Sequence, residues 1–172
     1  ASDLIYFSAQ VFDPEDPALF LDIEWSSQLD GVFHSQAANF DGLSDFYYDG
    51  LSSGWHTITV QVTDQAGLSA EDSLSLLINT PPEEPIVSIV PQLPATDVDM
   101  TAVVGELVDL DGDLPTVDYI WYKDGSPTSY TGSVVPATAT TKGELWQVVV
   151  QAADAYSASS TASAQVTIQN TA

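Results

Sequence analysis

The sequence predicts an all-β protein made of two tandem β-sandwich domains, and three observations support this fold class. Apolar and polar residues alternate strictly in runs such as Thr57–Val62, and no stretch has the length and 3.6-residue period of a helix. Asp-Gly pairs, which favour tight turns because both residues tolerate positive φ, separate these runs. One spacing occurs twice: Asp13 precedes Trp25 by twelve residues, and Asp109 precedes Trp121 by twelve.

The repeat also indicates the domain boundaries. In both copies a second Trp opens a strand that ends in Asp, from Trp55 to Asp64 and from Trp146 to Asp154, and each copy closes on Asn-Thr. A period of about ninety residues is typical of tandem domains, which we place at residues 1–80 and 81–172. Residues 81–85 form a proline-rich connector, so we expect the domains to lie in line with limited bending.

The expected strands of the two copies differ where each copy begins. Copy two starts with Ile86–Val90 and Met100–Val108, the first and second strands of an immunoglobulin-like sandwich. In copy one, Leu4–Phe12 leads into Asp13 and matches the second strand, so a first strand is not evident. Either that strand lies upstream of Ala1 or another molecule donates it, because an unpaired strand edge is a template for an added strand. Later half-buried strands are expected around residues 73–76 and 163–168.

Several segments resemble the PKD-type immunoglobulin-like repeats of bacterial and archaeal cell-surface proteins. These segments are residues 11–17, 24–31 and 51–64 of copy one, and residues 79–91, 109–113, 119–125 and 142–146 of copy two. The resemblance spans nearly the whole chain and implies tandem β-sandwiches in an extracellular array. Repeats of this kind serve as spacers, adhesin stalks, surface-layer parts or appendages of enzymes.

Composition excludes several classes of partner. The chain has 25 Asp and Glu against two Lys and no Arg, for a formal net charge of −23. Such a surface repels nucleic acid and anionic membranes, whose phosphates are neutralised by basic residues. No apolar run reaches the length of a membrane span, and no Cys is present, so we expect neither membrane insertion nor a thiolate metal site. The acidity either maintains solubility, as in a salty habitat, or holds cations.

The acidic residues form two equivalent sets. Each set joins the loop after the second strand to the loop after the penultimate strand, and these loops emerge at the same end of an immunoglobulin-like sandwich. The candidate calcium ligands are Asp13, Glu15, Asp16 and Asp64 in copy one and Asp109, Asp111, Asp113 and Asp154 in copy two. Calcium takes six to eight oxygens and suits such carboxylate and carbonyl sets. Glu83 and Glu84 of the connector are further candidates, and the alternative is that these Asp residues are solvated turn formers.

The aromatic residues suggest a core and an alternative function. Trp25 and Trp121 are expected to be buried between the sheets, while Trp55 and Trp146 lie at strand starts. A glycan-binding surface needs exposed aromatic rings. Its candidates are Phe46, Tyr47, Tyr48, Tyr122, Tyr130 and Tyr156.

Catalytic motifs are not evident. The chain has two His residues, His34 and His56, and His56 is expected at the surface or at a strand edge. Carboxylate pairs are frequent, but such an acidic composition produces them by chance. No nucleophile elbow, phosphate loop or zinc-protease helix is present, so we expect no enzymatic activity.

These observations favour an extracellular or cell-surface structural protein. The expected function is a subunit or segment of a filament, surface layer or adhesin stalk, stiffened by calcium and Pro, with head-to-tail self-association. The alternatives are a glycan-binding module and a non-catalytic accessory module of a secreted protein.

Overall fold

The structure is a computed structural model that describes residues 4–171, and it separates into two compact units. Unit 1 is Ala1–Ile78 and unit 2 is Asn79–Ala172. Strands dominate both units, and the helical content of the described residues is two short 3₁₀ turns, η1 (Ala18–Phe20) and η2 (Ala137–Ala139). Within residues 4–171 no helix is long and apolar enough to cross a membrane. The all-β prediction and the tandem sandwich prediction are therefore confirmed.

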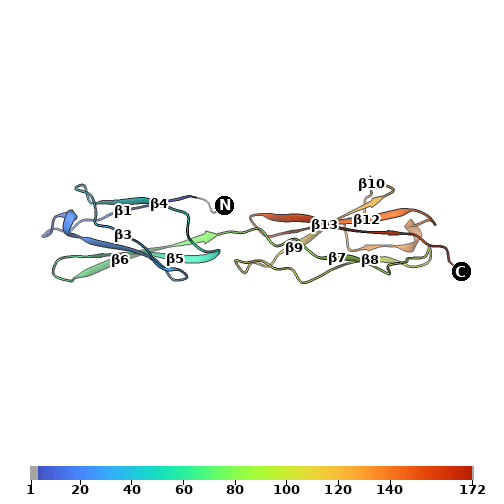
Figure 1. Ribbon diagram of the computed structural model, residues 1–172, viewed down its shortest axis with the longest axis horizontal. Coiled ribbons are helices and arrows are strands. Elements are labelled where there is room, and N and C mark those ends of the chain that lie inside the picture. The colour runs from blue at the N-terminus through green and yellow to red at the C-terminus, as the bar shows by residue number, and fades with distance from the viewer. Residues whose placement is uncertain (1–3, 172) are drawn as a thin grey trace. The chain divides into compact units, whose positions relative to one another are not determined.

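Unit 1 packs a two-stranded sheet against a four-stranded sheet (Figure 1). The small sheet pairs β1 (Ile5–Gln10) with β4 (Leu43–Tyr48). The large sheet has the order β3-β2-β5-β6, and every pairing is antiparallel. Its strands are β2 (Asp22–Ser27), β3 (Gly31–Ser35), β5 (Gly54–Thr63) and β6 (Ser69–Ile78).

Unit 2 packs a three-stranded sheet against a four-stranded sheet (Figure 1). The three-stranded sheet has the order β11-β8-β7, from β7 (Val87–Val90), β8 (Met100–Val104) and β11 (Val134–Val135). The four-stranded sheet has the order β10-β9-β12-β13. Its strands are β9 (Thr116–Lys123), β10 (Ser126–Pro127), β12 (Leu145–Ala153) and β13 (Ala158–Thr167).

Each unit has its own core, centred on the Trp of the repeated pattern. Trp25 is 3% exposed and Trp121 fully buried, as the sequence predicts. The indole N–H of Trp121 donates to the Gly132 carbonyl at 2.9 Å, which satisfies the one polar group of this buried ring. Trp146 is also buried, whereas Trp55 is half exposed. The two Trp residues at strand starts therefore have different environments.

Turn chemistry also agrees with the sequence. Asp124 and Gly125 both have positive φ, at 49° and 80°. Two consecutive residues of this kind form the tight turn whose twist matches a right-twisted hairpin, here β9–β10. Asp-Gly pairs thus place the strand ends close to where the sequence predicts them.

The first strand that is not evident in the sequence of copy one is also not present in the sheets of the described residues of unit 1. In unit 2, β8 is flanked by β7 and β11. In unit 1, the equivalent strand β1 pairs with β4, and among the described residues no strand lies on its other edge. Residues Leu4–Phe12 are therefore not flanked on both sides by strands of their own unit.

Candidate functional sites: a carboxylate cluster and an open strand edge

The loop after β8 and the loop after β12 meet at one end of unit 2. Asp109 accepts a hydrogen bond from the backbone N–H of Asp111 at 3.0 Å, and Asp111 accepts one from the N–H of Thr80 at 2.8 Å. Asp154 accepts the hydroxyl of Ser157 at 3.0 Å, and Asn79 donates its side-chain amide to that hydroxyl at 2.8 Å. The structure thus joins two predicted acidic loops with Asn79 and Thr80, the residues just before the connector.

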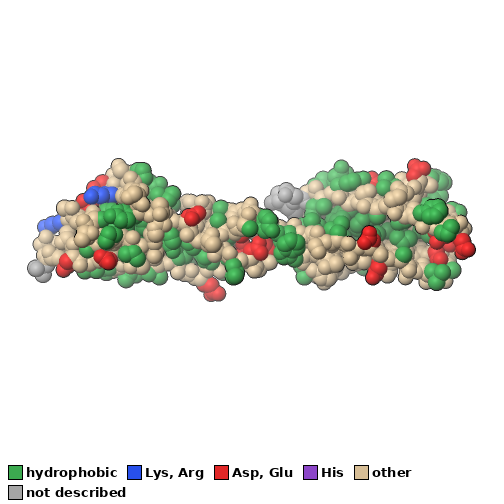
Figure 2. Space-filling view, turned by 180° about the vertical axis from the view of Figure 1, so that it is seen from behind, with side chains coloured by type: hydrophobic (Ala, Val, Ile, Leu, Met, Phe, Trp, Pro, Cys, Tyr) green, Lys and Arg blue, Asp and Glu red, His purple; other side chains and the backbone are tan. Residues whose placement is uncertain are grey.

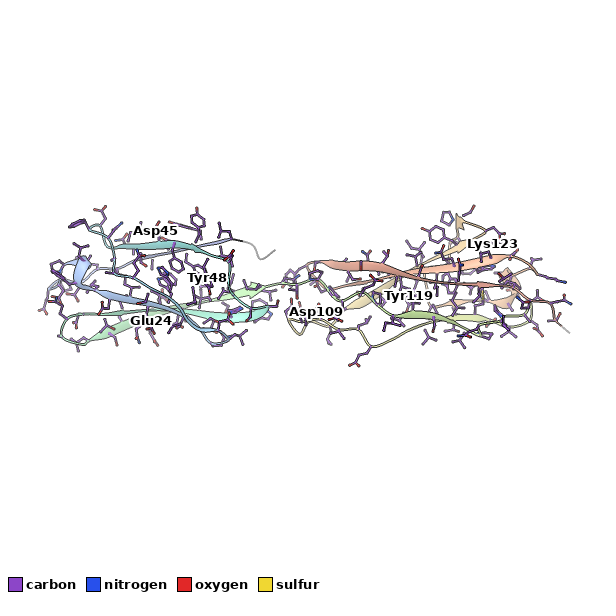
Figure 3. All side chains as sticks on the ribbon, viewed as in Figure 1. Glu24, Asp45, Tyr48, Asp109, Tyr119 and Lys123 are labelled. Atoms are coloured by element: carbon purple, nitrogen blue, oxygen red, sulfur yellow. The ribbon has the colours of Figure 1, made fainter. Side chains whose placement is uncertain are left out.

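The carboxylates of this cluster affect one another electrostatically. The close approach of the Asp111 carboxylate and desolvation raise the pKa of Asp109, and the negative charges of Asp111 and Asp154 raise it further. Burial also acts to raise the pKa of Asp111, but hydrogen bonds from Asp109, Thr80 and Asp113 lower it overall. Figure 3 shows that Lys123 lies toward the other end of unit 2 from Asp109. The carboxylates of Asp109, Asp111 and Asp154 are therefore close enough to repel one another, and Lys123 is not beside them.

Several oxygens of these loops are buried without a partner. Asp109 Oδ2, Asp113 Oδ2 and Asn79 Oδ1 have no hydrogen-bond donor. Within residues 4–171, no group of three or more His, Asp or Glu side chains is arranged to hold a metal ion. A cation here would draw on the unpartnered oxygens of Asp109, Asp113 and Asn79. Such an all-oxygen mixed set fits Ca²⁺.

The residues that bond to acidic-loop side chains lie just before the connector and are not the expected Glu83 and Glu84. Glu84 accepts the hydroxyl of Ser160 at 2.6 Å, and the backbone N–H of Glu83 donates to the Val108 carbonyl at 2.9 Å. Asn79 and Thr80, just before the connector, bond to side chains of the two acidic loops, whereas Glu83 bonds to the backbone of one of them. The Asn-Thr pair that closes each copy was the available sequence signal for this role.

The acidic set of unit 1 has a different local structure. Asp13 accepts the backbone N–H groups of Asp16 and Glu15 at 2.8 and 2.7 Å, which lowers the pKa of Asp13. Asp64 accepts the N–H of Leu68 at 2.7 Å. Both carboxylates line one groove, but the hydrogen bonds of each close its own turn. Unit 1 thus brings Asp13 and Asp64 to one groove, and calcium binding by this set stays a prediction.

The free edge of β1 carries unpaired backbone groups. The N–H of Val11 donates to the Gly42 carbonyl at 2.8 Å, on the β4 side. In an antiparallel pair, residues alternate between those that bond to the partner strand and those that point away from it. Val11 continues the register of β1 with β4, so Tyr6, Ser8 and Gln10 direct their N–H and C=O groups to the opposite edge.

An open groove of about 670 Å³ lies beside this edge. Residues 8–13 form one wall and residues 68–74 form the other, while the buried side chains of Leu21, Trp25 and Ile58 line its depth. Leu74 lies on the same face of β6 as the core residues Leu76 and Ile78, yet Leu74 is 53% exposed. An inward-facing Leu with this exposure shows that the sandwich of unit 1 is uncovered here.

Unit 2 fills the equivalent position with its own chain. Strand β7 pairs with β8, and Ile89 of β7 is 3% exposed within the core. The segment before β7 is held on both sides, because Gly105 donates to the Ile86 carbonyl at 2.9 Å and Ser160 bonds to Glu84. In unit 2 the first strand thus covers the opening that unit 1 presents to solvent.

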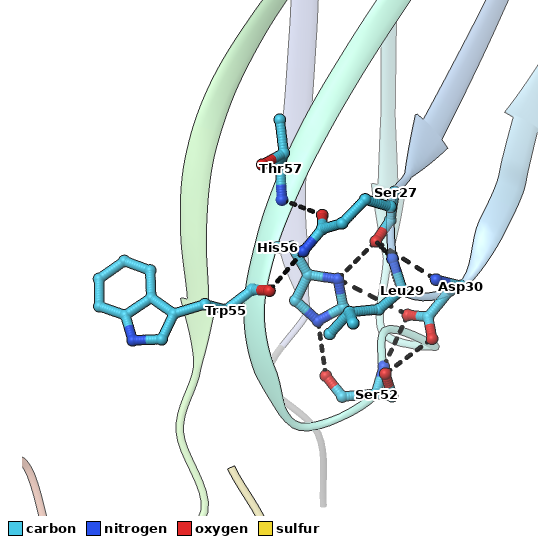
Figure 4. Close-up of polar contacts among 8 residues, drawn as sticks. Ser27, Leu29, Asp30, Ser52, Trp55, His56 and Thr57 are labelled. Carbon is cyan, nitrogen blue, oxygen red and sulfur yellow. Dashed lines mark hydrogen bonds and ion pairs between the residues drawn. The ribbon is translucent and has the colours of Figure 1, made fainter. Parts of the chain in front are cut away.

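The environment of His56 differs from the prediction. The expected surface or strand-edge residue is 1% exposed and lies inside unit 1 (Figure 4). Its Nε2 bonds to the Ser52 carbonyl at 2.8 Å, and its Nδ1 lies 2.6 Å from the hydroxyl of Ser27. Because a carbonyl can only accept, Nε2 carries the proton, and Nδ1 accepts from Ser27. The prediction was wrong because His56 shares the inward face of β5 with Ile58, where the Ser27 hydroxyl and the Ser52 carbonyl satisfy its ring.

The Ser27, His56 and Asp30 side chains do not form a catalytic triad. The Ser27 hydroxyl and the Asp30 carboxylate both face Nδ1 of His56, at 2.6 and 3.8 Å, so no proton relay passes through the ring. Ser27 is buried and accepts the N–H of Leu29. The network closes the turn after β2 onto the loop before β5.

The glycan-binding candidates divide by exposure. Tyr47 is 64% exposed and pairs with exposed Tyr6, with ring centroids 5.0 Å apart. Phe46 packs in the core of unit 1, and Tyr130 packs against Trp146 in unit 2. The sequence did not single out Tyr6, although its place in a strand beside Tyr47 follows from pairing of β1 with β4.

The fold defines the chain as a tandem immunoglobulin-like β-sandwich protein. No family model matches it, and no curated protein matches it. Solved structures similar to it in fold include the fibronectin(III)-like modules of Clostridium thermocellum CbhA, at 15% identity and a TM-score of 0.37, covering 99% of this chain and 87% of that chain. The first three domains of the bacteriophage RB49 Highly Immunogenic Outer Capsid protein match at 20% identity and a TM-score of 0.38, covering 98% and 55%. The N-terminal four Ig domains of Dscam1 isoform 9.44 match at 14% identity and 0.39, covering 99% and 42%.

Proposed function

We propose that the protein is a structural segment of an extracellular filament, surface layer or adhesin stalk that joins neighbouring molecules end to end. The main support for this proposal is the open edge of β1. The equivalent strand of unit 2, β8, has a neighbouring strand on both sides, whereas among the described residues β1 has one on one side. Unpaired strand edges promote association unless a charge, a Pro or a covering segment protects them. Association through a groove on one unit is heterologous, so it continues from molecule to molecule and produces a chain of subunits.

Sedimentation velocity over a range of protein concentrations tests this function. We expect concentration-dependent oligomers that Leu74→Glu weakens at least tenfold, because it places a carboxylate on the exposed apolar wall of the groove. Leu29→Glu is the matched control, since Leu29 is equally exposed at 52% but lies outside the groove. A protein that stays monomeric up to about 1 mM, the weakest range of specific association, contradicts the proposal. Equal effects of the two substitutions contradict it as well.

Calcium binding at the carboxylate cluster of unit 2 is the second part of the proposed function. Its support is the three mutually repelling carboxylates together with the unpartnered oxygens of Asp109, Asp113 and Asn79. A cation among them would reduce the repulsion and would also hold Asn79, which lies just before the connector. Calcium would stiffen the chain at this point by restraining Asn79 and Thr80.

Calorimetry with calcium and with a chelator tests this part. Calcium at 100 times its Kd stabilises the folded unit by about 2.7 kcal/mol, which corresponds to roughly 10–20 °C in Tm for a domain of this size. Asp111→Asn should abolish the shift, whereas Asp118→Asn, an exposed change on β9 with the same loss of charge, should retain it. An unchanged Tm in the two buffers contradicts the calcium proposal. The number of calcium ions bound per chain in a calorimetric titration then tests the expected site in unit 1. Two ions per chain would indicate a second site at Asp13 and Asp64.

A glycan-binding role is the second candidate function, favoured by the exposed pair Tyr6 and Tyr47. Adjacent exposed rings provide a stacking surface, and Asp45 beside them accepts the Tyr6 hydroxyl at 3.1 Å. Saturable polysaccharide binding that is lost in Tyr47→Ala and kept in Tyr156→Ala would support it. Absence of binding across neutral and acidic polysaccharides would contradict it.

A further inference from the structure

Two unsatisfied features of unit 1 coincide at the same place. The edge of β1 presents the backbone groups of Tyr6, Ser8 and Gln10, and the adjoining groove exposes the apolar side chains of Leu68 and Leu74. A ligand that fills the groove with side chains but makes no backbone hydrogen bonds satisfies only one feature. An extended strand satisfies both, since it pairs with β1 and directs alternate side chains into the groove.

Unit 2 shows the chemistry of a strand that fits this position. Val87 and Ile89 of β7 pack on the core, while Ser88 lies between them and Val90 is half exposed. The strand runs antiparallel to β8 and is already paired in its own unit. The inward positions are therefore two β-branched apolar residues separated by one outward residue.

The charges around the groove add a second requirement. Asp13, Asp64, Glu71 and Asp72 line it, and its lining contains no Lys or Arg. Both Lys residues of the chain belong to unit 2, and the face of unit 1 visible in Figure 2 shows apolar and acidic side chains without a basic one. Acidic side chains beside this rim are unfavourable, whereas uncharged or basic ones are accepted.

We propose that unit 1 is completed by an extended strand of another immunoglobulin-like repeat molecule, antiparallel to β1, with β-branched apolar residues at two alternate inward positions and no acidic residue. The inference rests on the proposed end-to-end function and specifies its partner segment. The added strand converts the β1–β4 pair into a three-stranded sheet like that of unit 2. It also covers Leu74, as β7 covers the equivalent face in unit 2.

The probe is a synthetic peptide of residues 85–92, which contains the inward pattern of β7 and no acidic residue. Amide hydrogen exchange by NMR on the intact protein measures where it binds. The amides of Ser8 and Gln10 should become protected at saturation, while those of Phe7 and Ala9, already directed to β4, should change little. Protection that appears instead on the outer edge of β3 or β6 overturns the assignment.

Peptide variants test the inward pattern at constant charge. Ile89→Asp in the peptide should weaken binding by about 10- to 100-fold relative to Val90→Asp, the range for burying one apolar side chain. In the protein, Ser8→Pro removes a backbone donor from the free edge, and Ser8→Ala retains it. Ser8→Pro should therefore reduce affinity at least threefold relative to Ser8→Ala, consistent with the loss of one hydrogen bond. Equal affinities of the two peptides overturn the proposal.

The outcomes separate this inference from the proposed function. If the peptide protects the amides of Ser8 and Gln10 but the protein never associates, the inferred strand pairing is supported and the proposed end-to-end association is contradicted. If the protein associates through the groove and the peptide does not bind, assembly stands and the proposed strand chemistry is wrong. Peptide that binds and also dissolves the oligomers supports both.

Discussion

Removal of the His56 side chain should destabilise unit 1 strongly. The ring is 1% exposed, and its two nitrogens bond to Ser27 and to the Ser52 carbonyl at 2.6 and 2.8 Å. His56→Ala leaves a cavity and two polar groups without their partner. Cavity formation and lost hydrogen bonds together cost about 3–5 kcal/mol. A unit of 78 residues has roughly 4–12 kcal/mol in total, so the variant should be close to unfolding.

Differential scanning calorimetry measures this effect against two controls. His56→Phe retains most of the volume and loses the hydrogen bonds, so it should cost about 2–3 kcal/mol. His34→Ala removes a ring that stacks on Phe46 at the edge strand β3 and should cost about 1 kcal/mol. A loss of about 3 kcal/mol corresponds to at least ~12 °C in Tm for a domain of this size. A shift below about 5 °C, or one equal to that of His34→Ala, would show that His56 is accessible to water and that the network is not structural.

Two further predictions concern acid stability and fluorescence. Partial burial acts to raise the pKa of Glu144, but hydrogen bonds from Lys123, Trp146 and Thr141 lower it to about 2 from an ordinary 4.5. A carboxyl whose pKa is lowered in the folded state stabilises the fold at pH values above its ordinary pKa, so this contribution should be lost as the pH falls from 4.5 toward 2. In urea titrations, Lys123→Met should make the free energy of unfolding depend less on pH in this range. An unchanged pH dependence in the variant contradicts the ion pair. Trp55 is 53% exposed, while the other three Trp residues are at most 3% exposed. Trp55→Phe should therefore remove nearly all of the fluorescence that iodide can quench. Substantial quenching in the variant would contradict the burial of the other three Trp residues.

The sequence by itself determined features that depend on neighbouring residues. The repeated Asp-Trp spacing placed Trp25 and Trp121 at equivalent core positions of two sandwiches, and both are buried. Asp-Gly pairs indicated turns because Gly has no Cβ and adopts positive φ without a steric penalty. The unpaired edge of β1 was also readable, because the repeat allows each strand of copy one to be matched with one of copy two.

Tertiary structure decided the environments that several loops create together. The inward position of His56 follows from its parity with Ile58, but the partners that satisfy its buried ring, the Ser27 hydroxyl from β2 and the Ser52 carbonyl, do not follow from that pattern. Asp13 and Asp109 have the same place in the repeat and each closes a local turn, yet Asp109 is also electrostatically coupled to Asp111 and Asp154. The physical reason is that burial and charge coupling depend on distances between segments far apart in the chain, which no local pattern specifies.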